Sequence, residues 1–302
     1  MTTATLHTAG SSQHEGAKHF LAALRIEVEE HPAVNHMFLC RLAHVPFTRE
    51  DYLVASTQHY PLVGTFTRYL EELLLRAPSS EAKSWLAKVL VDEYGEGSEG
   101  KDHRTLYREY LVAAGLKGHE ELDTHLHPHV SDFVLEHLRI CREEPFLTGL
   151  GAVGPGHEWS IPKMFRLIIA GLRRAGFAEN EISYFTLHSL QDIDHGRWLE
   201  EALLLYATTP EAQQQIRRGA LLSLAAREKF WSGVQDKVTR WRQPDNVHAR
   251  PQAKNRFSLQ NLADKLDPRR VDLTNTQKRA REMTLRQLRA ITALNKDAPI
   301  EH

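Results

Sequence analysis

The chain has 302 residues, of which 41% are hydrophobic and 25% are charged, and its formal net charge is -1. This is the composition of a globular protein with enough length for one large domain or two small ones, and the balanced charge gives no reason to expect a nucleic-acid or membrane partner. Two cysteines, Cys40 and Cys141, are too few for a disulfide framework, so we expect a protein of the reducing cytoplasm.

Residues 1–14 are polar, and we expect them to be disordered. From Glu15 onward, apolar residues recur at helical spacing almost everywhere, whereas the alternation typical of strands is absent. The sequence therefore predicts an all-α protein. Pro61 lies inside one predicted helix and is expected to kink it. The predicted helices cover about 15–30, 33–43, 49–76, 80–95, 102–115, 129–141, 161–176, 179–207 and 210–242.

After Trp241 the sequence becomes polar, basic and proline-punctuated, which is typical of a linker. We therefore place the helical core at 15–242 and a C-terminal extension at 243–302. Within the extension, residues 274–294 have the pattern of an amphipathic helix. We expect this arm to pack on the core or on a second subunit, and we expect a homodimer.

One helical segment, HSLQDIDH, places His188, Asp192 and His195 at steps of four and three residues. Each residue of an α-helix advances by about 100°, so these three side chains fall within roughly 60° of one another. Two imidazoles and a carboxylate on one face can form half of a metal site. Taken alone, the segment is more typical of an ordinary polar stripe on a helix.

A second segment, VLVDEYGEGSEGKDH, favours the metal site. Glu93 lies near the end of a predicted helix, and His103 follows ten residues later, across a stretch that contains three glycines. Glycines in a helix cost about 1 kcal/mol each relative to alanine, so this break is better explained if it lets two side chains face one centre. A third segment, GPGHEWSIP, puts His157 and Glu158 just before another predicted helix.

The mixture of ligand types indicates the metal. Carboxylates neutralise and bridge two hard cations while imidazoles fill terminal positions, so this set favours a dinuclear iron site. Helical bundles build such sites from Glu and His side chains on facing helices. A set of imidazoles and thiolates alone would have indicated zinc or copper.

The two motifs EYGEGSEGKDH and HSLQDIDH, together and in this order, resemble those of the haem-oxygenase-like diiron oxidases and oxygenases. The resemblance spans about residues 20–210. It implies a bundle of about seven core helices like that of haem oxygenase, without haem. It also implies two Fe(II) per chain, O2 as cosubstrate and an external electron donor. Members of this family oxidise amino acids, their derivatives or fatty acids, so we expect N-oxygenation or oxidative C–C cleavage of a small, amino-acid-derived substrate in specialised metabolism.

The family's metal ligands carry over residue by residue. Its second-helix Glu and His fall on Glu93 and His103, and its last-helix His, Asp and His fall on the HSLQDIDH residues named above. The family also has a Glu on an early core helix, where this sequence has no clean match. His59 occupies the corresponding place by position, and Glu158 matches a segment where relatives often carry a Glu. Either residue is therefore a candidate for the remaining ligand.

Two alternatives stay open at this point. The first is a metal-free enzyme of the same fold, similar to thiaminase II or pyrroloquinoline quinone synthase, which uses Cys, Glu and His side chains. Neither Cys40 nor Cys141 lies in a motif that indicates a nucleophile, which lowers this alternative. The second is a non-catalytic helical binding protein. Bound iron would distinguish both from a diiron enzyme.

Overall fold

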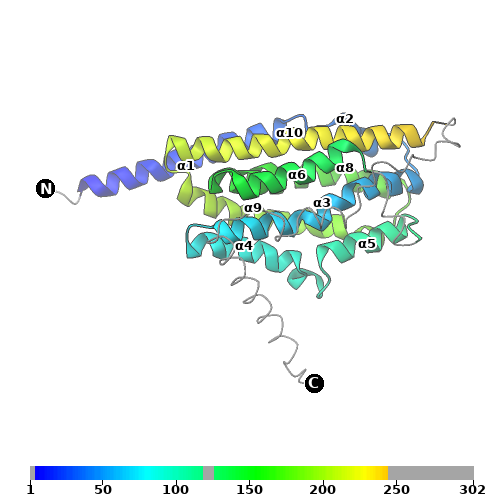
Figure 1. Cartoon of the computed structure of the whole chain (residues 1–302), viewed down its shortest axis with the longest axis horizontal. Helices are drawn as coiled ribbons and strands as arrows, with labels where there is room; N and C mark the ends of the chain where they lie inside the picture. Colours follow the sequence, from blue (N-terminus) through cyan, green and yellow to red (C-terminus); the bar gives the residue numbers. More distant parts are fainter. Residues whose placement is uncertain (1–3, 118–125, 244–302) are drawn as a thin grey trace, which may run out of the picture. The chain divides into compact units, whose positions relative to one another are not determined.

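The computed structural model describes residues 4–117 and 126–243, and these residues form the helices α1 to α10 with no β-strand (Figure 1). The all-α prediction is therefore confirmed. The predicted C-terminal extension, apart from its first residue, lies outside the described residues. None of the described helices combines the length and the apolar character needed to cross a membrane.

Most predicted helices agree with the structure to within a few residues. Pro61 lies within α3, which is assigned as one α-helix along its whole length. α1 begins at Ala4 rather than near Glu15, so the expected disorder of residues 1–14 differs from the structure over 4–14; once a helix is nucleated, extending it by one residue costs little. The α-helices are α1 (Ala4–Glu30), α2 (Met37–His44), α3 (Arg49–Arg76), α4 (Ser80–Glu93), α5 (His103–Ala113), α6 (Pro128–Glu143), α7 (Phe146–Val153), α8 (Ile161–Arg174), α9 (Ser183–Tyr206) and α10 (Pro210–Trp241).

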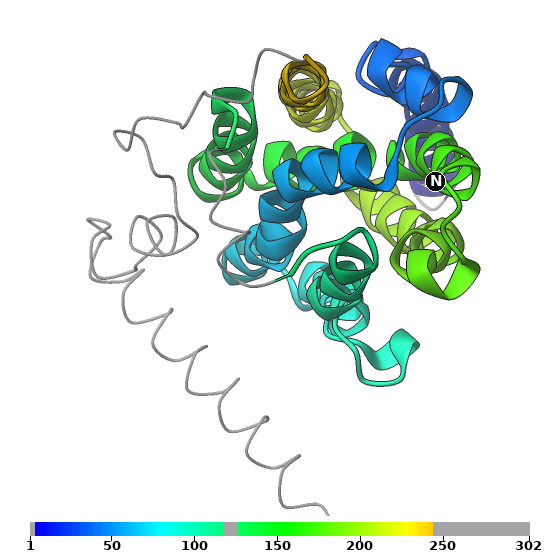
Figure 2. The same ribbon diagram turned by 90° about the vertical axis from the view of Figure 1, so that its right-hand side faces the viewer.

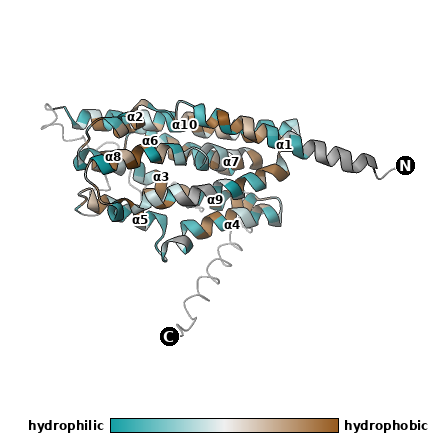
Figure 3. Cartoon of the chain, turned by 180° about the vertical axis from the view of Figure 1, so that it is seen from behind, coloured by the Kyte–Doolittle hydropathy of each residue, from teal (hydrophilic) through white to brown (hydrophobic). Residues whose placement is uncertain are grey.

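The helices pack as a bundle in which α10 contacts α2, α3, α6 and α7, while α9 contacts α4, α5 and α8. Figure 2 views the bundle along α10, which lies between α2 and α6. Hydrophilic and hydrophobic residues are mixed along most of the long helices (Figure 3), as expected when one face of a helix is buried and the other is solvated. The helices that carry the predicted site motifs, α4, α5 and α9, contact one another through α9.

α7 was not predicted from the sequence, because its glycines resemble those of a loop. They are needed instead for a close approach of two backbones. A Cβ added at Gly151 would lie 2.1 Å from the Ile216 carbonyl oxygen, and one added at Gly219 would lie 1.9 Å from the Thr148 carbonyl oxygen. Because no larger side chain fits these distances, α7 and α10 pack backbone against backbone.

An ion pair ties the start of α3 to the end of α10. Asp51 belongs to the capping box of α3, in which it and Thr48 exchange hydrogen bonds at the N-terminus. Arg242 donates two further hydrogen bonds to Asp51, from Nη2 at 2.6 Å and from Nε at 2.9 Å. Burial acts to raise the pKa of Asp51, but the hydrogen bonds from Arg242 and Thr48 outweigh it and hold this pKa below its ordinary value.

We predict that Asp51→Asn lowers the free energy of unfolding by about 1–2 kcal/mol at pH 7, because it removes a cap and two charge-assisted hydrogen bonds. A carboxyl with a depressed pKa stabilises the fold above its unfolded pKa, near 4, and this stabilisation is lost as the pH falls through the folded pKa. Urea unfolding from pH 7 to pH 3 should therefore show the wild type converging on the variant. Glu50→Gln, on an exposed residue of the same helical turn, is the control. A difference that is constant over this pH range would contradict the assignment.

Candidate metal centre

The glycine-rich segment after α4 turns the chain so that the end of one helix meets the start of the next. Gly95 has φ +106°, and a Cβ added there would lie 2.7 Å from the carbonyl carbon of Lys101. The left-handed backbone and the close approach both require glycine. Asp102 then caps α5 by accepting a hydrogen bond from a backbone N–H of the first turn at 2.6 Å. The segment thereby brings Glu93, the last residue of α4, next to His103, the first residue of α5.

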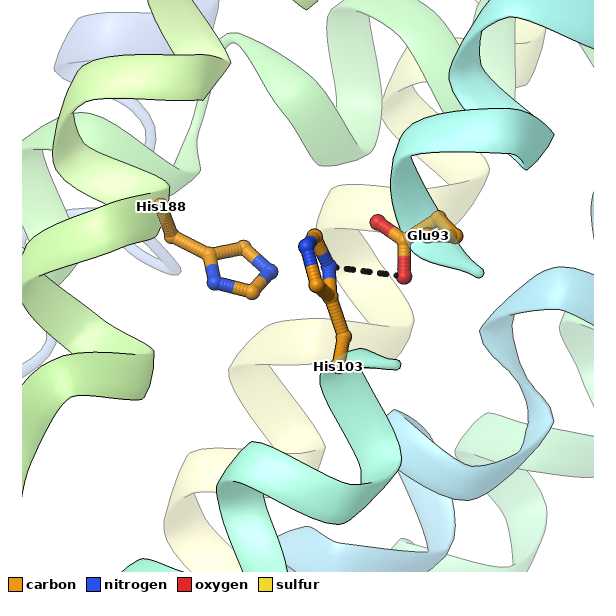
Figure 4. A group of neighbouring side chains, drawn as sticks. All are labelled: Glu93, His103 and His188. Carbon is orange, nitrogen blue, oxygen red and sulfur yellow. Dashed lines mark ion pairs between the residues drawn. The ribbon is translucent and has the colours of Figure 1, made fainter. Parts of the chain in front are cut away.

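Glu93, His103 and His188 form a buried group whose possible ligand atoms all lie within 4.8 Å of one another (Figure 4). Glu93 Oε2 is 3.0 Å from His103 Nδ1, and the rings of His103 and His188 have centroids 4.2 Å apart. His188 Nδ1 donates a hydrogen bond to the Tyr184 carbonyl oxygen at 2.7 Å. That bond fixes the tautomer in which Nε2 carries a free lone pair, the form that binds a metal.

His195 and Glu158 form a second buried pair, with His195 Nδ1 3.5 Å from Glu158 Oε2. On the other side of the ring, His195 Nε2 donates a hydrogen bond to Asp92 at 2.9 Å. Metal-binding histidines are commonly oriented by such a carboxylate on their second nitrogen. Glu158 is the last residue of a π-helix, η3 (Gly154–Glu158). Short π-helical turns are rare in proteins as a whole, but those that occur are often found at functional sites.

Several atoms of these groups lack a hydrogen bond although they are buried. They are both ring nitrogens of His103, Nδ1 of His195 and Oε2 of Glu158. A buried polar atom without a partner costs about 1–3 kcal/mol. Metal ions would satisfy one nitrogen of His103, Nδ1 of His195 and Oε2 of Glu158, while the other His103 nitrogen keeps its proton, so the residues present fit a metal centre.

Glu93, Glu158 and His188 also line one cavity, together with His59 and Arg227. The cavity volume of about 20 Å³ is enough for one or two water-sized groups. Ions fit this space, whereas a whole substrate molecule requires the site to open. Most of the remaining lining is apolar or aromatic, which limits the access of water, and consists of Leu62, Val63, Phe66, Ile161, Phe165 and Tyr184.

The surroundings set the charge of each histidine. Burial lowers the pKa of His188 well below its ordinary value, so this ring is neutral and able to act as a ligand. Burial also acts against protonation of His103, but the charge of Glu93 outweighs it and raises the pKa. For His195, Glu158 and Asp92 outweigh burial and raise the pKa to about 10. Metal binding at these two rings would therefore release protons.

The two remaining candidate ligands are Asp192 and His59. Asp192 lies on α9 between His188 and His195, but its side chain is outside the described part of the chain. His59 lines the cavity, yet its Nδ1 is hydrogen-bonded to the Tyr107 hydroxyl at 3.0 Å, and it is not part of the Glu93 group.

Asp92 and Arg227 were not predicted from the sequence as residues of the site, and His157 was predicted to lie outside the ligand set. Asp92 had no signal, because it is one of several acidic residues near the glycine-rich segment. Arg227 had one: it falls on the apolar stripe of α10, between Leu224 and Phe230, where a charged residue is unusual. His157 is 3% exposed and lines the cavity.

Comparison with known proteins decides the family. Residues 54–228 match the model of a family described as iron-containing redox enzymes. The chain belongs to this family. The resemblance inferred from the motifs is thereby confirmed, and the chain is an oxidoreductase of an iron-containing family. The matched segment includes all of the candidate ligands described above.

Two named synthases are similar to this iron-containing redox enzyme in sequence, and a solved structure is similar to it in fold. The 4-aminobenzoate synthase of Chlamydia trachomatis is 27% identical over 189 residues, which is 62% of this chain and 79% of that protein. The 4-chloro-allylglycine synthase of Streptantibioticus cattleyicolor is 23% identical over 225 residues, 73% of this chain and 84% of that protein. A domain from Shewanella denitrificans with a heme oxygenase-like fold superposes with a TM-score of 0.59 at 14% identity, over 74% of this chain and 92% of that one, which confirms the predicted fold.

Proposed function

We propose that this protein is a non-haem diiron oxygenase or oxidase that uses O2 to oxidise a small, amino-acid-derived substrate. The observation that carries the proposal is the group of buried carboxylates and imidazoles from α4, α5, α9 and η3, several of whose ligand atoms have no hydrogen-bond partner. Glu93, Glu158 and His188 of this group line one cavity. In this proposal two Fe(II) bind per chain. O2 is the cosubstrate, and an external donor supplies electrons.

The residues divide between the two ions by proximity. Glu93, His103 and His188 would hold one ion, because their ligand atoms already converge. His195 and Glu158 would hold the other, with Asp192 as a further carboxylate from the same helix turn. Glu93 and Glu158 are the candidates to bridge, because both line the shared cavity. His59 keeps its hydrogen bond to Tyr107 and is the weakest candidate.

Iron in such a set supplies the redox chemistry that activates O2. The protein's own residues supply orientation and exclusion of water. Asp92 holds His195, and the Tyr184 carbonyl holds His188, so both rings are fixed before any metal binds. Phe165 and Ile161 cover the cavity with apolar surface and protect reactive species from water.

The substrate class rests on the relatives. The names 4-aminobenzoate synthase and 4-chloro-allylglycine synthase both describe products that carry an amino group and a carboxylate. A substrate of similar chemistry is therefore proposed for this chain. N-oxygenation and oxidative C–C cleavage are the reactions to examine first.

The two alternatives lose support. Cys141 is buried, which raises the pKa of its thiol, and neither Cys141 nor Cys40 lines the cavity. A cysteine nucleophile of the kind used by thiaminase II is thus absent from the described walls of the site. A purely structural binding protein gives no reason to leave buried atoms of His103, His195 and Glu158 without hydrogen-bond partners.

Titration of the anaerobic, metal-free protein with Fe(II), followed by mixing with O2 in a stopped-flow spectrophotometer, tests the proposal. We predict binding of two irons per chain and a transient visible absorption. His188→Ala should lose at least one iron and the transient band. The control His44→Ala changes an exposed histidine at the end of α2 and should behave as wild type. Failure of the wild type to take up iron would overturn the proposal.

A further inference from the structure

Arg227 is a buried cation without a carboxylate partner. It is 1% exposed, in the middle of α10. Among the described residues no ion pair includes it, and its Nε has no hydrogen-bond partner. Arginine is rarely buried in this way, because removing the charge from water is costly unless a counter-ion compensates.

Within the described part of the chain, none of the direct contacts of Arg227 is with a carboxylate, although the charge of Glu158 in the same cavity acts on the guanidinium from a distance. One Nη2 hydrogen bond goes to Nδ1 of His157 at 2.5 Å, and the guanidinium lies 5.0 Å from the centroid of the Phe133 ring. Because a guanidinium can only donate, His157 Nδ1 accepts this hydrogen bond through its lone pair, so this partner is a neutral ring. Neither a neutral imidazole nor a benzene ring supplies a negative charge.

Arg227 and His157 line the same cavity as Glu93, Glu158 and His188. A guanidinium presents parallel N–H donors that match the two oxygens of a carboxylate. The cavity has the volume of one or two water-sized groups, which is close to that of a carboxylate head. A negatively charged group placed there would supply the hydrogen-bonded counter-ion that Glu158 does not provide.

We propose that Arg227 binds the carboxylate of the substrate and so places the rest of that molecule against the metal centre. The proposal deepens the proposed function and rests on it for the substrate class. His157 is a positioning residue in this scheme: by accepting one N–H of the guanidinium, it directs the remaining donors. Specificity for carboxylic acids over their amides would follow, because a neutral amide leaves the buried charge unpaired.

Acetate and its neutral analogue acetamide are suitable probes, because they carry the carboxylate and the amide on a single methyl group and so require the least opening of the cavity. Their affinities are measured by thermal shift and by calorimetry on the full chain, metal-free and anaerobically loaded with Fe(II), at constant ionic strength. We expect the wild type to bind acetate at least tenfold more tightly than acetamide. Arg227→Met should abolish this preference without lowering the melting temperature, because it removes a buried unpaired charge and keeps the length of the side chain. The control Arg218→Met, on an exposed arginine of α10 paired with Glu144, should keep the preference.

Arg227→Lys keeps the charge but loses the paired donors, so acetate should bind at least fivefold more weakly than to the wild type. This variant decides the matter if Arg227→Met does not fold. An acetate affinity unchanged in both variants, or equal binding of acetate and acetamide by the wild type, would overturn the proposal.

Iron content in the same samples separates this inference from the proposed function. If the wild type binds iron while the acetate preference is absent or independent of Arg227, the carboxylate anchor is wrong and the diiron enzyme stands. If the preference depends on Arg227 but no iron binds, the anion site stands and the diiron proposal fails.

Discussion

Glu93→Gln is expected to weaken iron binding by more than about 100-fold and to remove the reaction with O2. Changes to groups that merely orient metal ligands already cost about 10- to 100-fold in metal affinity, and Glu93 is a candidate ligand itself. The amide keeps the size of the side chain and loses the charge that faces His103 at 3.0 Å. The fold should therefore persist while the cation is lost. Iron per chain after desalting and O2 consumption with a chemical reductant measure the two effects.

Glu96→Gln is the matched control for this experiment. Glu96 is an exposed carboxylate three residues along, in the short 3-10 turn η1 (Glu96–Ser98). It should bind iron as the wild type does. Equal iron content in the wild type and Glu93→Gln would show that Glu93 is not a ligand, and the pairing with His103 would then be a structural ion pair.

Gly219→Val is expected to have the largest effect on stability. Its Cβ would lie 1.9 Å from the Thr148 carbonyl oxygen and 2.9 Å from the Ala152 nitrogen, and both are backbone atoms of α7. Side-chain rotation cannot relieve this overlap, so α7 and α10 must separate. Overpacking of a core costs about 1–3 kcal/mol and sometimes more, so we expect at least about 3 kcal/mol here. The melting temperature should fall by roughly 10 °C, or the variant should fail to fold.

Gly16→Ala provides the contrast. Gly16 lies inside α1 with no atom within 4 Å of an added Cβ. Alanine should stabilise this helix by about 0.5–1 kcal/mol, because glycine has the higher conformational entropy in the unfolded chain. Calorimetry of the two variants therefore tests whether packing, rather than glycine content, decides these positions. A wild-type melting temperature for Gly219→Val would contradict the close contact of α7 and α10.

The helices with regular apolar spacing could be predicted from sequence, because a helix that buries one face has apolar residues at intervals of three or four positions. α3 was predicted with its bounds, since Thr48 caps it at one end. α7 could not be predicted, because its glycines serve a contact with Gly219, which is remote in sequence. The same holds for η3, whose Gly156 is next to Ser223 of α10.

The site was predictable where the ligand pattern is local. His188, Asp192 and His195 share one helix, and their spacing made them candidate ligands. Glu93 and His103 were found because glycines interrupt a helix between them. The hydrogen bond between His195 and Asp92 joins residues far apart in the chain, so no pattern in the sequence predicts it. Arg227 is visible in the sequence as a charged residue on the apolar stripe of α10. Its role could not be inferred there, because it depends on which residues line the cavity.

The turn between α4 and α5 has a consequence for recognising and redesigning related proteins. The contact of Glu93 with His103 is made by the last residue of one helix and the first residue of another, so it depends on how the two helices pack against α9. The nine residues between them turn the chain and cap α5, but none of them belongs to the candidate ligand set. Loops of other lengths could serve the same geometry. A search for homologous sites should therefore leave this spacing free and hold the spacing of the α9 motif fixed.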